Sequence, residues 1–333
     1  MAKRKINGIF LLDKPEGISS STALVRTRAM FKAQKGGHTG ALDPLASGLL
    51  PICLGEAAKF SSFFLEGKKR YIAEGTLGQS TTTCDREGEI VATRVIGAAM
   101  SRLEEVLPSF CGPITQVPPI YSAVKVNGKP LYKYARQGRA DEVEIPSRQV
   151  EIYELKLLEK TETTFTVEVF CSKGTYIRTL INDIGEALGC GAFVSKLRRT
   201  FVEGLPHGQM MPLTELQQLV DGRSDKNDFR ALDAHLIPIE EALGNLPIVS
   251  LERHQAEPLS HGMRLKEVEI TPVLTKLYHS GTLSPLQVNE LFQVRYHDHF
   301  LGVCYLDEQG TLIPKRMMDP ELMQQYLAAE TQA

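Results

Sequence analysis

The order of strand-like and helix-like segments is the feature that most constrains the fold of this chain. Strand-like segments occur in pairs along the sequence, and helical segments separate the pairs. We expect strands at residues 5–12, 70–77, 150–158, 164–171 and 192–202. We expect helices at residues 19–33, 56–65 and 177–188, and a hairpin at the Asn-Gly turn of residues 126–129. This order predicts an α+β fold with a mainly antiparallel, mixed sheet.

The length of 333 residues suggests two domains, and a change of pattern places their boundary near residue 247. We assign residues 1–246 to the first domain and treat residues 203–246 as an acidic connector region within it. Short strand-like runs separated by turns follow at residues 264–270, 291–295, 301–306 and 312–314. They predict a small β-rich domain over residues 247–333.

Composition excludes several classes of protein. No apolar run reaches the roughly 18 residues of a membrane-spanning helix, because the longest candidate, residues 45–54, contains Ser47, Gly48 and Pro51. The basic N-terminus is followed by too short an apolar run for a signal peptide. We therefore expect a cytoplasmic protein that binds no membrane. The six cysteines are scattered without a Cys-x-x-Cys pair, so we expect neither a metal site nor a disulfide framework.

The charges are unevenly distributed, although the formal net charge is only −2. Residues 1–37 carry eight basic and two acidic residues, a net charge of +6. Residues 122–139 carry five basic residues and no acidic one, and tyrosines are interleaved with them. Residues 203–245 have a net charge of −5. Solvated helix faces could explain the charges alone, but basic residues interleaved with aromatic ones favour nucleic acid binding.

A glycine-rich run at residues 36–48 is the strongest candidate for a functional loop. Its four glycines allow positive φ angles and close approach of another molecule. Asp43 precedes a proline, which disfavours helical backbone at the aspartate. The run lacks the Gly-Lys-Ser/Thr of a phosphate-binding loop, and His38 and Asp43 have no third metal ligand nearby. The pattern alone leaves a structural loop and a catalytic loop equally open.

Several motifs follow one another in a fixed order. They are residues 11–20 (LLDKPEGISS), 37–49 (GHTGALDPLASGL), 54–57 (LGEA), 69–71 (KRY), 119–125 (PIYSAVK), 171–180 (CSKGTYIRTL) and 197–199 (LRR). Through these motifs the chain closely resembles the TruB family of tRNA pseudouridine-55 synthases over about residues 6–202, and chance agreement is negligible. The C-terminal part is similar only in its position and its strand-like pattern, where such enzymes carry a PUA-like RNA-binding domain.

The resemblance implies the chemistry of pseudouridine formation. The glycosidic bond of a uridine is cleaved and the base is rejoined through carbon without net redox change, so no cofactor and no metal are expected. The family's catalytic aspartate falls on Asp43, which is ionised at neutral pH as a nucleophile must be. Arg178 matches the arginine that pairs with this aspartate and orients it.

The resemblance also implies a pocket for a flipped uridine. Tyr71 matches the tyrosine that stacks on the base, and Tyr176 and Leu197 match positions that line the pocket. If residues 176–178 are extended, the side chains of Tyr176 and Arg178 share one face. His38 matches the histidine that enters the space vacated by the nucleotide, and Lys14 is expected to support the site by packing and charge.

The expected substrate is U55 in the T stem-loop of tRNA. We expect a monomer that needs no obligatory protein partner. One alternative is a guide-RNA-dependent pseudouridine synthase, and another is a non-catalytic module that binds or folds tRNA. A catalytic assay on a minimal stem-loop without other proteins separates the three.

Overall fold

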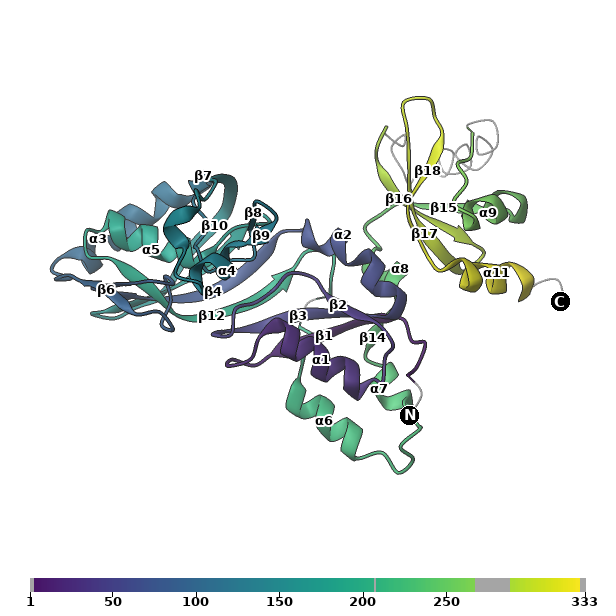
Figure 1. Cartoon of the computed structure of the whole chain (residues 1–333), viewed down its shortest axis with the longest axis horizontal. Helices are drawn as coiled ribbons and strands as arrows, with labels where there is room; N and C mark the ends of the chain where they lie inside the picture. Colours follow the sequence, from purple (N-terminus) through teal and green to yellow (C-terminus); the bar gives the residue numbers. More distant parts are fainter. Residues whose placement is uncertain (1–2, 207, 267–287, 330–333) are drawn as a thin grey trace.

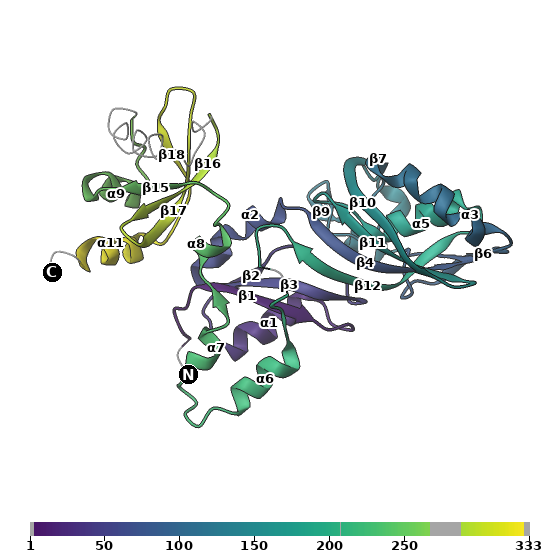
Figure 2. The same ribbon diagram turned by 180° about the vertical axis from the view of Figure 1, so that it is seen from behind.

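The computed structural model describes residues 3–206, 208–266 and 288–329. Figure 1 shows an elongated molecule in which a long, twisted sheet occupies one part and a smaller sheet forms a lobe of its own. Figure 2 shows the same two parts from behind. Within the described residues, no helix is both long enough and apolar enough to cross a membrane.

The large sheet contains ten strands in the order β13-β1-β3-β12-β4-β11-β10-β7, with β14 beside β1 and β2 beside β3. Two pairs, β3–β12 and β1–β13, are parallel, and the other pairs are antiparallel. The predicted α+β fold with a mainly antiparallel, mixed sheet is confirmed. The strands are β1 (Gly8–Lys14), β2 (Gly36–His38), β3 (Ala46–Leu54), β4 (Lys69–Leu77), β7 (Gly112–Gln116), β10 (Arg148–Lys160), β11 (Thr164–Cys171), β12 (Ala192–Val202), β13 (Met211–Pro212) and β14 (Leu236–Ile237).

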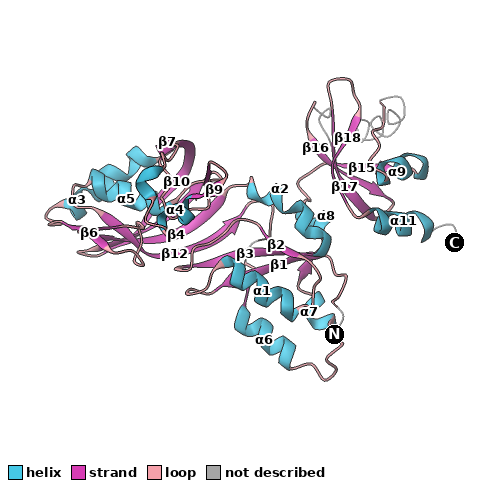
Figure 3. Cartoon of the chain, viewed as in Figure 1, coloured by secondary structure: helices cyan, strands magenta, loops and turns pink. Residues whose placement is uncertain are grey.

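Two groups of helices lie towards opposite ends of this sheet (Figure 3). Near β1 and β3 lie α1 (Ser20–Met30), α6 (Leu213–Asp221) and α7 (Arg230–Asp233); near β4 and β10 lie α3 (Ala99–Val106), η2 (Leu107–Phe110) and α5 (Ile177–Ala187). The hydroxyl of Ser19 accepts a hydrogen bond from the Thr22 backbone N–H at 3.1 Å and caps α1. Leu180, Ile181 and Ile184 of α5 are fully buried, as their helical spacing predicts.

The segment predicted as one helix at residues 56–65 differs from the prediction. It forms a 3₁₀ helix, η1 (Gly55–Phe60), followed by the short α2 (Ser61–Leu65). Phe60 and Phe64 are buried, whereas Phe63 is only half-buried. Two aromatic rings are buried within these two short helices. Tertiary packing therefore determines the path of the segment more than helix propensity does.

Two small hairpins project from the large sheet. One is β5 (Gln79–Thr81) with β6 (Ile90–Thr93), and the other is β8 (Lys125–Val126) with β9 (Lys129–Pro130). The Asn-Gly turn is confirmed, because Asn127 and Gly128 have φ angles of 51° and 77°. After β9 the basic segment forms α4 (Leu131–Ala135), and η3 (Ala140–Glu142) follows the segment.

The acidic connector belongs structurally to the large sheet. Between residues 203 and 246 it forms β13, α6, α7, β14 and α8 (Ile239–Ala242). Both of its strands pair with β1, so the connector completes one edge of the sheet.

The second sheet has the order β15-β16-β17-β18. Its strands are β15 (Ile248–Leu251), β16 (Leu291–Tyr296), β17 (His299–Leu306) and β18 (Leu312–Met317), and the helices α9 (Arg253–Ser260) and α11 (Pro320–Ala329) accompany it. The strand predicted at residues 264–270 lies partly outside the described residues; its described part makes a single bridge from Leu265 to Leu312 and is not a strand. The helices α9 and α11 were not predicted. Pro258 lies inside α9, and because proline is unfavourable in the interior of a helix, the sequence does not indicate a helix there.

The two sheets share a hydrophobic core. Phe60 of η1 and Phe300 of β17 have ring centroids 5.4 Å apart. Gln293 of β16 is fully buried and donates hydrogen bonds to the carbonyl oxygens of Glu240 (3.0 Å) and Leu243 (2.8 Å). The C-terminal sheet is therefore packed against η1 and α8 rather than tethered by a bare linker. The division into domains at residue 247 stays a prediction.

Candidate active site

The loop that carries Asp43 connects β2 to β3 and is bound to the turn between β1 and α1. The Ser20 hydroxyl donates to the Leu42 carbonyl oxygen at 2.9 Å and accepts from the Leu42 N–H at 2.7 Å. The Gly17 N–H donates to the Pro44 carbonyl oxygen at 2.8 Å. Backbone contacts on both sides of Asp43 therefore hold the backbone from which its side chain projects.

Close packing explains one glycine of this loop. Gly48 has a φ angle of +96°, and a Cβ atom there would lie 2.2 Å from the Arg199 carbonyl oxygen. The Arg199 side chain is buried and donates to the carbonyl oxygens of Leu49 (2.7 Å, from Nε) and Gly40 (3.1 Å, from Nη2). The backbone of β12 and this guanidinium thus hold the glycine-rich run against the sheet.

Arg178 forms an ion pair with Asp43. Its Nε lies 2.9 Å from Asp43 Oδ2, and the Arg178 side chain is only 4% exposed. Its Nη1 and Nη2 each donate at 2.9 Å, to the carbonyl oxygens of Thr83 and Tyr121. Two further loops therefore fix the guanidinium that faces the carboxylate.

The backbone around Arg178 differs from the extended stretch considered in the sequence. Tyr176 is extended and precedes α5, whereas Arg178 lies in the first turn of that helix. The two side chains reach the same region because the chain turns from a loop into a helix between them, and a shared strand face plays no part.

Asp85 joins this arrangement and was not predicted. Its Oδ2 lies 3.5 Å from Arg178 Nη1, and its side chain is 5% exposed. Its Oδ1 accepts from the Thr83 hydroxyl (2.6 Å) and the Glu87 N–H (3.0 Å). In the sequence Asp85 lies within the hydrophilic run Thr-Cys-Asp-Arg-Glu-Gly-Glu, which reads as an exposed turn. Only the spatial neighbourhood of Arg178 reveals it.

A cavity of about 170 Å³ opens beside the Asp43–Arg178 pair. Five of the seven predicted site residues line it: Asp43, Tyr71, Tyr176, Arg178 and Leu197. Its other lining residues are Ala41, Leu42, Ser122, Ala123, Thr175 and Ile177. The cavity thus combines one carboxylate and one guanidinium with mainly apolar and aromatic walls.

Neighbouring strands and one buried amide position the walls of this cavity. Tyr71 of β4 lies opposite Arg199 of β12, two residues along from Leu197. The Gln116 side chain accepts from the Tyr176 N–H at 3.0 Å and donates to the Tyr176 carbonyl oxygen at 3.2 Å. Burial raises the pKa of Tyr71, and the positive charge of Arg199 opposes this rise.

Burial and nearby charges act on the Asp43 carboxyl in opposite directions. Burial raises its pKa, and Asp85 contributes in the same direction. The positive charges of Arg178 and Lys14 oppose that rise. The side chain is still 40% exposed, so the carboxylate remains accessible from the cavity.

Lys14 and His38 do not line the cavity. Lys14 is fully buried, and its Nζ donates to the carbonyl oxygens of Pro15 (2.8 Å), Ile18 (2.8 Å) and Pro44 (3.4 Å). Burial lowers its pKa to about 8. His38 is half-buried on β2, and burial, followed by the charge of Arg199, lowers its pKa.

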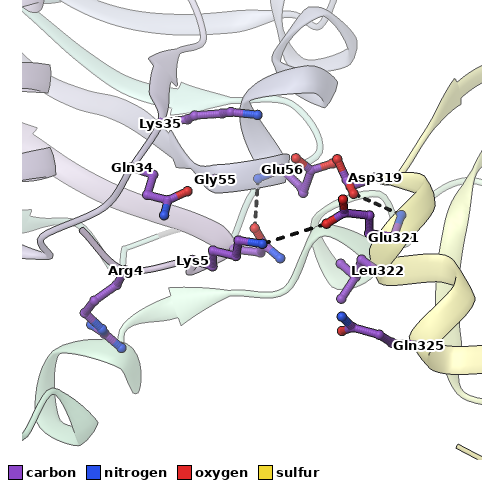
Figure 4. Close-up of a pocket in the computed structure, with 11 residues that line it drawn as sticks. Arg4, Lys5, Gln34, Lys35, Gly55, Glu56, Asp319, Glu321, Leu322 and Gln325 are labelled. Atoms are coloured by element: carbon purple, nitrogen blue, oxygen red, sulfur yellow. Dashed lines mark hydrogen bonds and ion pairs between the residues drawn. The ribbon is translucent and has the colours of Figure 1, made fainter. Parts of the chain in front are cut away.

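A larger cavity of about 400 Å³ lies between the N-terminal segment and α11 (Figure 4). Its charged groups have mixed signs, and Lys5 Nζ lies 4.0 Å from Glu321 Oε2 across it. None of the predicted site residues lines it. In the part of the chain that the structure describes, no group of three or more His, Cys, Asp or Glu side chains could hold a metal ion.

Comparison with known protein families gives two adjoining matches. Residues 28–177 match the TruB family pseudouridylate synthase (N terminal domain), and residues 178–244 match the tRNA pseudouridylate synthase B C-terminal domain. The first match contains Asp43 and the second begins at Arg178, so the ion pair joins the two matched segments.

Similar proteins cover nearly the whole chain. A protein of Mannheimia succiniciproducens named tRNA pseudouridine synthase B is 43% identical over 316 residues, which cover 95% of this chain and 97% of the relative. A protein of Haemophilus influenzae (strain PittEE) with the same name is 48% identical over 316 residues, 95% of this chain and 96% of the relative.

Solved structures support the fold. A chain of a Cbf5-Nop10-Gar1 complex matches with a TM-score of 0.69 at 22% identity, covering 95% of this chain and 86% of that chain. An archaeal Nop10-Cbf5 complex matches with a TM-score of 0.65 at 20% identity, covering 95% of this chain and 88% of that chain. On its adjoining family matches and its relatives of nearly equal length, this chain belongs to the TruB family of pseudouridylate synthases.

Proposed function

We propose that this chain converts a uridine in the T loop of tRNA, U55, to pseudouridine, with Asp43 as the nucleophile and without a cofactor. The observation that carries the proposal is the Asp43–Arg178 ion pair at a cavity with mainly apolar and aromatic walls. The relatives named tRNA pseudouridine synthase B support tRNA as the substrate.

The cavity suits a base that has left its stack. A uridine in a folded loop must be flipped out of its neighbours before a side chain can reach it. Tyr71 and Tyr176 offer aromatic faces for stacking, and Leu197 offers an apolar wall that excludes water. We assign these three residues to binding of the flipped uridine.

Asp43 supplies the nucleophile in this proposal. During the isomerisation the glycosidic bond to the ring nitrogen breaks and a bond from the ribose to a ring carbon forms. That ring carbon loses its proton and the freed ring nitrogen takes one up, so the atoms balance. The bond that the Asp43 carboxylate forms as the nucleophile is broken again, which regenerates the carboxylate. No electrons are gained or lost overall, so no redox cofactor is required. Arg178 holds the Asp43 carboxylate charged and oriented through the 2.9 Å contact.

Lys14 and His38 receive supporting roles. Lys14 contacts the Pro44 carbonyl oxygen directly after Asp43, and so it supports the loop and adds positive charge near the carboxylate. His38 lies outside the cavity on β2 of the same glycine-rich run. We assign it to the space that the flipped nucleotide leaves behind in the RNA.

The basic segments would hold the RNA backbone. The segment at residues 122–139 pairs cations with tyrosine rings: Lys129 lies 4.3 Å from the Tyr134 ring centroid and Arg136 lies 5.4 Å from that of Tyr132. We propose that this segment and the basic residues before residue 38 bind phosphates, and that the C-terminal part acts as a PUA-like RNA-binding domain. We further propose a monomer that works in the cytoplasm without a protein partner.

The test is conversion of a synthetic T stem-loop by the purified chain alone, with the modified position mapped. We expect pseudouridine at the position equivalent to U55, with and without a chelator on a stem-loop that folds in monovalent salt. Turnover that appears only with an added guide RNA would favour the guide-dependent alternative. Tight RNA binding without any turnover would favour a tRNA-folding module.

A further inference from the structure

Arg148 is a half-buried arginine for which the described part of the chain provides no counter-ion. It is the first residue of β10, and its Nε is buried without a hydrogen-bond partner. Its side chain makes no hydrogen bond and no ion pair with any residue that the structure describes. Arginines that lose part of their hydration normally pair with an anion, so this guanidinium has unused binding capacity.

Other arginines near the cavity are paired. Arg178 contacts Asp43 and Asp85, and Arg199 donates to two backbone carbonyl oxygens. Arg70, which precedes Tyr71, bonds to two glutamates. Arg148 therefore differs from its neighbours in lacking an acceptor among the residues that the structure describes.

Arg148 lies against the loop that forms one wall of the cavity. Its guanidinium carbon is 5.6 Å from the centroid of the Tyr176 ring. A Cβ atom on Gly174 would be 3.3 Å from Arg148 Nη1, and Gly174 has a φ angle of +74°. Gln116, which binds the backbone of Tyr176, is the register partner of Arg148 in the β7–β10 pair. Tyr176 thus lines the cavity, and the guanidinium of Arg148 lies over the Tyr176 ring.

We propose that Arg148 binds a backbone phosphate of the RNA strand whose flipped uridine occupies the cavity. The inference rests on the proposed function and adds a phosphate contact to it. A nucleotide carries its phosphate one ribose away from its base, so a cation beside the base-binding tyrosine is within reach of the strand. The planar guanidinium can donate parallel hydrogen bonds to two phosphate oxygens. Because Gly174 has no side chain, no Cβ atom at that position crowds Arg148 Nη1 where the phosphate would bind.

The experiment measures binding of a T stem-loop by Arg148→Gln and Arg148→Lys at several salt concentrations. Lys156→Gln, an exposed lysine on the same strand, is the matched control for loss of one positive charge. We expect Arg148→Gln to weaken binding about tenfold and to flatten the slope of log K against log salt by about 0.7 to 0.9. Arg148→Lys should fall between Arg148→Gln and the unmodified chain, and Lys156→Gln should leave both quantities unchanged.

A second arm identifies the phosphate. Stem-loops that carry a single neutral methylphosphonate at successive positions around the target uridine are bound to the unmodified chain and to Arg148→Gln. One position should weaken binding to the unmodified chain about tenfold and leave binding to Arg148→Gln unchanged, since the contact is already lost. Equal losses for both proteins at every position, or unaltered binding by Arg148→Gln, would overturn the proposal and leave Arg148 a packing residue for Tyr176. If the unmodified chain does not isomerise the unmodified stem-loop, the proposed function is refuted. The two binding experiments would still show whether Arg148 contacts a phosphate.

Discussion

The Arg178 guanidinium lies 2.9 Å from the Asp43 carboxylate, yet the arginine is 4% exposed and the aspartate 40% exposed. The arginine is anchored in the protein by two backbone carbonyl oxygens and by Asp85, whereas the aspartate faces the cavity. An ion pair built in this way restricts the carboxylate without enclosing it. This asymmetry suits a carboxylate that must reach a substrate.

Replacing Asp43 by asparagine should abolish turnover while the fold persists. The amide keeps the size of the side chain but is a very poor nucleophile, so we expect the rate of pseudouridine formation to fall at least about a thousandfold. Because the side chain is 40% exposed, thermal unfolding should change little. Single-turnover assays on a stem-loop measure the rate, and circular dichroism checks the fold. Substantial turnover by folded Asp43→Asn protein would remove Asp43 from the catalytic role.

Replacing Arg178 by leucine should cost both activity and stability. The substitution leaves Asp85, which is 5% exposed, without its cationic partner. Removing one member of a buried ion pair costs roughly 3 kcal/mol or more. Urea unfolding should show this loss for Arg178→Leu and a smaller one for Arg178→Leu combined with Asp85→Asn. Equal losses in the single and double variants would argue against a stabilising role for the Arg178–Asp85 contact.

The sequence predicted the fold and named five residues that line one cavity, but it did not show how separate loops meet. Buried and less buried residues alternate along β11, and apolar residues gather on one face of α5. Both patterns are visible in the sequence, so these two elements could be predicted from it. The position of Asp85 could not be predicted, because a polar turn in the sequence does not show that a buried arginine lies beside it in the fold. Lys14 was expected to support the site by packing and charge, and its Nζ donates to backbone carbonyl oxygens next to Asp43. Its role stays a prediction.

The buried Lys14 should make stability depend on pH above neutrality. Its pKa is about 8 in the folded chain, against an ordinary value of 10.5. Between these values the unfolded chain binds more protons, so this group makes the free energy of unfolding rise with pH. The advantage of the unmodified chain over Lys14→Met should therefore grow from pH 8 to pH 10.5 in urea titrations. A difference that stays constant over this range would contradict the lowered pKa.

Neutralising Lys129, Lys133 and Arg136 together should weaken the salt dependence of tRNA binding. Each lost phosphate contact removes up to about 0.9 from the slope of log K against log salt, so we expect a flattening of about two units. The choice of uridine should not change, because phosphate contacts position RNA without reading its sequence. Arg139, which is paired with Glu142, provides the control for a cation already engaged within the protein. An unchanged slope in the triple variant would identify the segment as a solvated surface.

The shared core should make the C-terminal sheet unfold together with the rest of the chain. Phe300 of β17 is 4% exposed and packs on the buried Phe60 of η1 with ring centroids 5.4 Å apart. Phe300→Ala should lower the free energy of unfolding by about 3 to 5 kcal/mol, whereas Leu158→Ala, at a residue 46% exposed, should stay within about 0.5 kcal/mol. The double variant Phe60→Ala/Phe300→Ala should lose less than the sum of the single losses, since one ring contact is counted in both. Strictly additive losses, or two separate unfolding transitions, would show that the two sheets are energetically independent.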